Sequence, residues 1–234
     1  MNLVILTGAG VSADSGVKTF RDAGGLWEGH RIEDVATPEA WRRDPATVWR
    51  FYQLRRAQLL TVEPNAAHLA LVALEQRLKA EGHGFVLITQ NVDDLHQRAG
   101  STVLSMHGEL CVLRCEACDM HVQGLGYLEQ DRFLPCPRCQ HPRLRPDIVW
   151  FGEMPYHLDA IADAMDDVTH FISIGTSGVV YPAAGLLAQA RRAGARTWVN
   201  SLDEPENLSP DDVFLPGKAA EVIPRFLEGW REGR

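Results

Sequence analysis

Four of the five cysteines form two pairs of identical spacing, Cys115-x-x-Cys118 and Cys136-x-x-Cys139, with seventeen residues between the pairs. Two short turns of this kind bring four thiolates to one point, and four thiolate ligands suit tetrahedral zinc. Two disulfides are the alternative, but the chain opens with an apolar segment rather than an export signal. We therefore expect one structural zinc ion per chain, with no open coordination position for catalysis. For Cys111, the remaining cysteine, we expect the role of a small buried apolar residue.

A glycine-rich turn is the second chemically suggestive feature. Residues 3–7 form a short apolar run, as expected for a strand buried on both faces of a parallel sheet. The run continues directly into a G-x-G-x-x-A pattern from Gly8 to Ala13. Glycines at its first and third positions let the backbone turn tightly and approach a pyrophosphate. Such turns also occur without a ligand, but this position after an N-terminal strand favours a dinucleotide site.

His107 is the candidate general base. It follows the apolar run 103–106 and precedes the cysteine-containing segment. Imidazole titrates near neutral pH and therefore suits proton transfer. A lone histidine in this context can also be a core residue with satisfied hydrogen bonds. Its place at the junction of two segments favours a position in a cleft.

The elements that must position these groups follow an alternating pattern. Three further apolar runs end in small polar residues: 85–89, 171–174 and 197–199. Ordinary turns would also contain such residues, but the carboxyl ends of parallel strands form the ligand crevice in open α/β sheets. We expect an α/β fold with a Rossmann-like, doubly wound parallel sheet over residues 1–28, 66–107 and 149–234.

Two insertions interrupt this sheet. Residues 29–65 have mixed helical spacing, with Pro38 and Pro45 as boundary signals, and residues 108–148 contain the four paired cysteines. We expect them to pack together as a small domain, a helical insert beside a zinc module, with a substrate cleft between the two domains.

Composition excludes several function classes. The 234 residues are 45% hydrophobic and 23% charged, which is typical of a globular protein. The net charge of −8 argues against nucleic-acid binding, which needs a basic surface. No apolar run approaches the roughly eighteen residues of a membrane span. We expect a cytoplasmic protein with no membrane partner.

Several motifs, in this order, resemble those of the sirtuins. The motifs are residues 8–16, 20–21, 89–96 and 107–108, the two cysteine pairs, and residues 149–153 and 175–177. The resemblance runs from about residue 4 to about residue 225 and is strongest to bacterial members. One departure is Val17-Lys18-Thr19, where many members have Ile-Pro-Asp. It puts in doubt any role of that aspartate in this chain, but not the role of Arg21.

The resemblance implies an NAD-dependent protein-lysine deacylase with a Rossmann-like domain and a zinc-containing small domain. In that mechanism the acyl oxygen attacks the nicotinamide ribose and expels nicotinamide, and His107 then removes a proton from the ribose hydroxyls. The acyl group is transferred to the ribose and hydrolysis frees the lysine, which leaves 2′-O-acyl-ADP-ribose. NAD⁺ is consumed as a co-substrate.

The resemblance also implies roles for individual residues. The catalytic residues would be His107, Asn91 and Asp93. The cofactor-binding residues would be Gly8, Ala9, Gly10, Ser12, Ala13, Phe20, Arg21, Trp27, Gln90, Asn91, Val92, Asp93, Gly175, Thr176, Ser177, Asn200, Ser201, Leu202 and Ala219. The peptide and acyl-lysine would contact Val149, Trp150, Phe151 and Gly152. The metal ligands would be Cys115, Cys118, Cys136 and Cys139.

A Tyr-x-x-Arg pair in the helical insert bears on the acyl group. Tyr52 and Arg55 are three residues apart and share a helix face. In the branch that this pair resembles, it recognises the distal carboxylate of succinyl- or malonyl-lysine, and Ala23 would match the small residue that leaves room for the acyl chain. A solvated helix face is the alternative, because Arg50 and Arg56 are close by.

Other functions stay open at this point. A zinc-ribbon interaction protein that uses NAD-like ligands only for regulation is one, although His107, Asn91 and Asp93 favour an enzyme. Mono-ADP-ribosyl transfer, an acetyl-preferring deacetylase and a nicotinamide-dinucleotide dehydrogenase are the enzymatic alternatives. The expected partners are acyl-lysine proteins or peptides, bound by a monomer.

Overall fold

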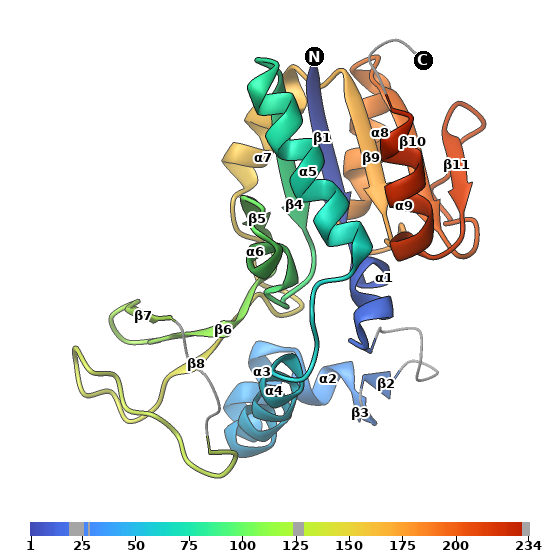
Figure 1. Ribbon diagram of the computed structural model, residues 1–234. Coiled ribbons are helices and arrows are strands. Elements are labelled where there is room, and N and C mark those ends of the chain that lie inside the picture. Colours follow the sequence, from blue (N-terminus) through green and yellow to red (C-terminus); the bar gives the residue numbers. More distant parts are fainter. Residues whose placement is uncertain (19–25, 28, 124–128, 231–234) are drawn as a thin grey trace.

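The fold was analysed in a computed structural model that describes residues 1–18, 26–27, 29–123 and 129–230. Its main element is a parallel sheet of six strands in the order β11-β10-β9-β1-β4-β5 (Figure 1). The strands are β1 (Asn2–Thr7), β4 (Gly84–Thr89), β5 (Val103–Ser105), β9 (His170–Ile174), β10 (Arg196–Ser201) and β11 (Val213–Pro216). This is the strand order of dinucleotide-binding α/β domains, with its switch point between β1 and β9.

Helices cover both faces of the sheet, as the apolar strands require. Leu3 and Ile5 of β1 pack on one face and Val4 and Leu6 on the other, because successive side chains alternate across a strand. One face is covered by α5 (Ala66–Ala80) and α9 (Ala219–Glu228), and the other by α7 (Leu158–Asp166) and α8 (Ala183–Arg192) (Figure 1). The predicted α/β fold class is confirmed.

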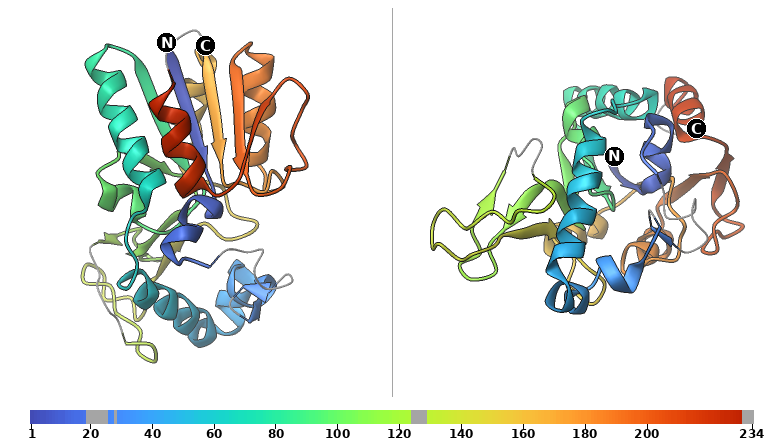
Figure 2. Two further views of the ribbon diagram at one scale, coloured as in Figure 1. Left: turned by 45° about the vertical axis from the view of Figure 1, so that its right-hand side comes forward. Right: turned by 90° about the horizontal axis from the view of Figure 1, so that it is seen from below.

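A smaller unit lies below the carboxyl ends of the strands (Figures 1 and 2). Its helices are α2 (Ile32–Val35), α3 (Pro38–Arg43) and α4 (Pro45–Leu59). A hairpin of β2 (Leu26–Trp27) and β3 (His30–Arg31) precedes them. As predicted, Pro38 and Pro45 mark helix boundaries, since each occupies the first position of its helix.

The cysteine-containing segment forms the other half of the small unit. Its strands β6 (Gly108–Arg114), β7 (His121–Val122) and β8 (Arg145–Ile148) form an antiparallel sheet in the order β7-β6-β8. One buried apolar cluster contains Trp41 and Trp49 from the helices together with Leu113 and Cys136 from the cysteine-containing segment. The two insertions therefore share a core. The predicted domain boundaries themselves stay predictions.

Among the described helices, none has the length and apolar character needed to cross a membrane.

Candidate active site and metal centre

The four paired cysteines converge in the small unit. Their Sγ atoms all lie within 4.8 Å of one another, and the nearest pairs are 3.6 Å apart. A disulfide would need about 2.05 Å, so the disulfide alternative is wrong. Four sulfurs held about 2.3 Å from a tetrahedral zinc ion lie about 3.8 Å apart, so this donor set fits zinc.

The two halves of the cluster have the same local structure. Cys115 N–H donates to the carbonyl of Met120, and Cys136 N–H donates to that of His141. Four residues after the first cysteine of each pair, Asp119 and Gln140 have φ values of 56° and 61°. Each Cys-x-x-Cys is thus a tight turn that aims two sulfurs at a common point.

The loops that follow β1 and β9 touch at the switch point of the sheet. Gly8 N–H donates to the carbonyl of Ile174 and Gly10 N–H to that of Gly175, both at 2.9 Å. A Cβ atom on Gly8 would lie 2.8 Å from the Gly175 oxygen, and one on Gly10 would lie 2.7 Å from the Gly175 Cα. The lack of a Cβ atom at Gly8 and Gly10 thus allows the two loop backbones to approach closely. The N–H groups of both glycines already donate to backbone carbonyls of the protein.

Buried polar side chains surround Ser12, at the end of the short helix α1 (Ala9–Ser12). Asn91 Nδ2 donates to Ser12 Oγ at 3.1 Å, and His68 Nε2 lies 3.5 Å from the same oxygen. Burial raises the pKa of Asp93, while hydrogen bonds from the Leu95 N–H and Ser12 lower it. The predicted residues Ser12, Asn91 and Asp93 are therefore brought together.

His68 was missed by the sequence analysis. Its Nδ1 accepts the N–H of Asn65 at 3.2 Å, so the ring proton must reside on Nε2 and is directed toward Ser12. The available signal was the Asn65-x-x-His68 spacing at the start of α5, where Asn65 caps the helix and His68 completes a capping box.

His107 lies between β5 and β6, at the junction of the two units. Its Nδ1 is 3.0 Å from the carbonyl oxygen of Gln90, which can only accept a hydrogen bond. The proton of the neutral ring is therefore held on Nδ1, and Nε2 keeps its lone pair. Burial lowers the pKa of His107 and the Gln90 carbonyl partly raises it, which favours the neutral, basic form.

A second polar group lies beyond β9 and β10. Gly175 has a φ of +63°, and its N–H donates to the Asn200 carbonyl at 2.8 Å. Asn200 is buried, and its Nδ2 donates to the carbonyls of Leu215 and Gly217. Its Oδ1 is buried without a hydrogen-bond partner among the described residues. An acceptor oxygen without a partner suits a hydrogen bond from a donor group of a bound nucleotide.

The remaining predicted cofactor residues differ in their surroundings. Thr176 and Ser201 are buried beside Asn200, Ala219 is buried at the start of α9, and Leu202 is 64% exposed. Val92 accepts the N–H of Leu110 at 2.7 Å. Phe20, Arg21 and Ala23 lie outside the described residues, and Trp27 is described only as part of β2.

Residues 149–153 leave β8 as a segment without regular strand structure. Val149 N–H donates to the carbonyl of His107, and Phe151 N–H donates to that of Ala36. Phe151 is 48% exposed, whereas Trp150 is buried. Ala36, which the sequence analysis did not consider, is thus the buried alanine that lies against this segment.

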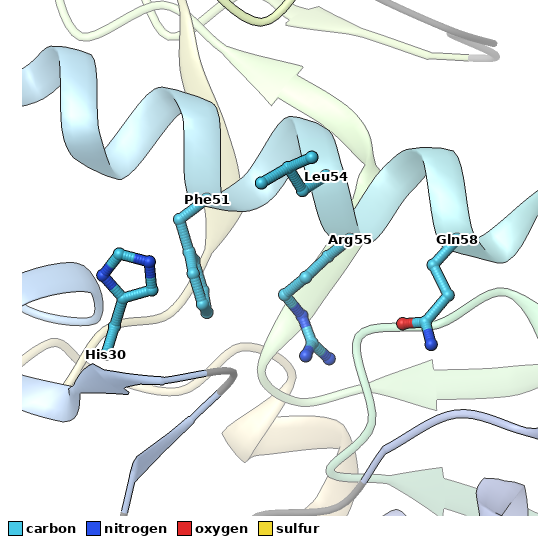
Figure 3. A pocket seen from close by; sticks show the side chains of 5 residues that line it. All are labelled: His30, Phe51, Leu54, Arg55 and Gln58. Atoms are coloured by element: carbon cyan, nitrogen blue, oxygen red, sulfur yellow. The ribbon is translucent and has the colours of Figure 1, made fainter.

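Arg55 lines a cavity of about 190 Å³ together with His30, Phe51, Leu54 and Gln58 (Figure 3). Its guanidinium carbon lies 5.8 Å from the Phe51 ring centroid, and the residue is only 8% exposed. Tyr52 does not line this cavity. It is fully buried, and its hydroxyl oxygen accepts the Trp150 indole N–H at 2.9 Å.

The positive charge of Arg55 links this cavity to the polar group around Ser12. Burial raises the pKa of Tyr52 and of Asp93, and the Arg55 charge lowers both. Arg55 therefore acts electrostatically on Asp93, a member of the polar group around Ser12, as well as on Tyr52.

Comparison with known proteins gives consistent results. The Sir2 family model matches residues 8–182. An NAD-dependent protein deacylase of Bdellovibrio bacteriovorus is 53% identical over 235 residues, which cover 99% of this chain and 97% of the relative. A solved Sir2 homologue–NAD complex has a TM-score of 0.87 at 40% identity, over 97% of this chain and 88% of that one. A mutant Sir2 homologue in complex with 2′-O-acetyl ADP ribose has a TM-score of 0.88 at 41% identity, over 97% and 90%.

Proposed function

Because this chain belongs to the Sir2 family and is an NAD-dependent protein deacylase, we propose that it removes succinyl and malonyl groups, as well as acetyl groups, from protein lysines. The observation that carries the acyl preference is the guanidinium of Arg55, a largely buried residue that lines the cavity shown in Figure 3. A succinyl or malonyl chain ends in a carboxylate, and an arginine fork can hold a carboxylate bidentately. An acetyl group has no charge at that end.

The residues that we propose for NAD⁺ fall on two sides of the switch point. The loops of Gly8–Gly10 and Gly175–Ser177 approach each other there, and Asn200 offers its buried Oδ1 on one side. Asn91 and Asp93 lie on the other side, where amide and carboxylate groups suit a carboxamide. When bound, NAD⁺ supplies an electrophilic ribose carbon with nicotinamide as its leaving group.

His107 is the proposed general base of this reaction. The Gln90 carbonyl holds the Nδ1 proton, which fixes the tautomer and leaves Nε2 to accept a proton from a hydroxyl group. The Val149 N–H bonded to the His107 carbonyl anchors the proposed acyl-lysine segment to the same residue. The acyl-lysine protein or peptide is the partner that this function requires. A monomeric state and a cytoplasmic location stay predictions.

The test is the double substitution Tyr52→Phe with Arg55→Met, assayed on acetyl- and succinyl-lysine peptides with NAD⁺. A charge-assisted hydrogen bond contributes roughly 1.5–3 kcal/mol, so kcat/KM for desuccinylation should fall at least about tenfold. Deacetylation should stay largely intact. Arg50→Met is the control, because Arg50 lies on the same helix but pairs with Asp131 at the surface.

Equal losses on both peptides would show that the pair supports the fold and would contradict the acyl preference. Nicotinamide release without any acyl-peptide, accompanied by ADP-ribosylated protein, would instead support mono-ADP-ribosyl transfer.

A further inference from the structure

The loop of residues 147–156 holds the main chain at His107 through hydrogen bonds from both of its ends. Near its start, Val149 N–H donates to the His107 carbonyl at 2.9 Å. At its end, Tyr156 N–H donates to the Met106 carbonyl, also at 2.9 Å. Because the main chain carries the imidazole, the position of the His107 ring depends on where both ends of this loop lie.

A side-chain hydrogen bond joins the two ends of the loop. Tyr156 Oη–H donates to Asp147 Oδ1 at 2.7 Å. Asp147 lies on β8 and is only 7% exposed, whereas Tyr156 is half-buried. Burial and the Asp147 carboxylate raise the pKa of Tyr156 to about 12, so its hydroxyl remains a donor near neutral pH. A hydroxyl that donates to a carboxylate forms one of the stronger hydrogen bonds in proteins, so this contact can close the loop.

The Asp147 carboxylate is oriented by the cysteine-containing segment. Arg114 Nε, on β6, lies 3.6 Å from Asp147 Oδ1, and His121 Nε2, on β7, lies 3.5 Å from Asp147 Oδ2. Arg114 Nη2 also lies 3.7 Å from Glu153, a residue inside the loop. With both carboxylate oxygens facing a partner, Asp147 has little freedom to turn away from Tyr156.

We propose that Asp147 and Tyr156 are positioning residues for His107, whose hydrogen bond closes the loop and keeps the imidazole where it can accept a proton. Residues 149–153, which we propose to contact the acyl-lysine, lie inside the same loop. One side-chain contact therefore fixes the base and the substrate-contacting segment relative to each other. The inference rests on the proposed role of His107 as general base.

The experiment uses the zinc-loaded protein with NAD⁺ and an acetyl-lysine peptide. In the proposed reaction nicotinamide leaves before the step that needs the base. Exchange of labelled nicotinamide into NAD⁺ therefore reports the earlier step, and formation of free lysine reports the later one.

In Tyr156→Phe the ratio of nicotinamide exchange to deacylation should rise about tenfold, because a slightly displaced catalytic group loses rate. KM for NAD⁺ should change little. Both rates are measured on the same sample, so any unfolded fraction of the variant cancels from the ratio.

Asp147→Asn is the conservative variant. Its amide oxygen can still accept the Tyr156 hydroxyl, so the ratio should rise less than in Asp147→Ala. Trp41→Phe is the matched control, because Trp41 Nε1–H donates to the Glu116 carboxylate at 2.8 Å in the same small unit. It likewise removes a hydrogen bond to a carboxylate, and it should leave the ratio unchanged even where stability falls.

Equal losses of exchange and deacylation in Tyr156→Phe, or two unchanged rates, would overturn the inference. An equal rise of the ratio in Trp41→Phe would overturn it too. His107→Ala separates the two claims. If His107→Ala raises the ratio and Tyr156→Phe does not, only the positioning role fails. If His107→Ala leaves the ratio unchanged, the general-base role fails and the positioning role fails with it.

Discussion

At the level of single residues, backbone groups that can only donate or only accept a hydrogen bond determine which ring nitrogen of a histidine carries the proton. The carbonyl of Gln90 assigns the proton of His107 to Nδ1, and the N–H of Asn65 assigns the proton of His68 to Nε2. One imidazole is thereby prepared to accept a proton and the other to donate a hydrogen bond to Ser12. The two histidines carry their protons on opposite ring nitrogens because their backbone partners differ.

For His107→Ala we expect kcat/KM for deacylation to fall by roughly two to four orders of magnitude, the usual contribution of a positioned general base. NAD⁺ affinity, measured by calorimetry, should change far less. The acidic limb of the wild-type pH–rate profile should have its midpoint below 6.5, because burial lowers the pKa of His107 and only the neutral ring is a base. His83→Ala, in a turn before β4, is the control. Deacylation near the wild-type rate in His107→Ala would refute the assignment.

The buried histidines also predict how stability depends on pH. Burial lowers the pKa of His68 to about 4 and that of His96 to about 3, from 6.5. Between these values and 6.5 the unfolded chain binds more protons, so stability is present above pH 6.5 and decreases as the pH falls. Each histidine should lower the free energy of unfolding by about 1.4 kcal/mol per pH unit in that window.

Urea unfolding of zinc-loaded protein at pH 7, 6 and 5 measures this slope. His96→Gln removes one of these titrating groups and should flatten the slope by about 1.4 kcal/mol per pH unit. A variant with the wild-type slope would show that His96 is not held neutral.

At the level of elements, the start of β6 controls how the small unit meets the sheet. Gly108 directly follows His107, has a φ of +81°, and pairs with Ile148 of β8. A Cβ atom at this position would overlap the carbonyl oxygen of Asp147. Only glycine therefore allows β6 to leave His107 and pair with β8.

Gly108→Ala should destabilise the protein by more than the roughly 1–2 kcal/mol that a left-handed alanine costs by itself. Gly82→Ala provides that reference, since Gly82 has a φ of +77° and nothing lies within 4 Å of its added Cβ. Thermal unfolding of both variants gives the comparison. Equal losses of stability would mean that the β6–β8 contact relaxes around the extra methyl group.

At the level of the whole molecule, the described apolar side chains form separate cores. Two lie on the faces of the parallel sheet, and the third joins the helical insert to the cysteine-containing segment. Trp41, Trp49 and Trp150 belong to the third core, whereas Trp198 and Trp230 belong to a sheet core. These five tryptophans thus report on the two units separately.

Removal of zinc by a chelator, or the substitution Cys136→Ser, should unfold the small unit, because a segment of about forty residues cannot bury enough apolar surface by itself. The near-UV signal of the small-unit tryptophans should be lost, and amide protons of β1, β4 and β9 should stay protected from exchange. Cys111→Ser is the control, since Cys111 is outside the cluster. Zinc-free protein with full activity and an unchanged near-UV spectrum would contradict a structural role for zinc.

The sequence by itself determined the features that depend on neighbouring residues. The Cys-x-x-Cys spacing sets the two tight turns of the cluster, and the apolar alternation of residues 3–6 sets a strand with two buried faces. Pro38 and Pro45 set helix starts. These features follow from local geometry, so a linear pattern is enough to predict them.

Tertiary structure alone decided which distant residues meet. The Trp150–Tyr52 hydrogen bond spans 98 positions and the Ser12–His68 contact spans 56. Ala36 lies against residues 149–153 because the end of α2 packs there and its carbonyl accepts the N–H of Phe151. No periodic pattern in the sequence predicts such contacts, because they depend on how the helices and strands pack against one another. Packing also determines which polar atoms are buried and must therefore form hydrogen bonds.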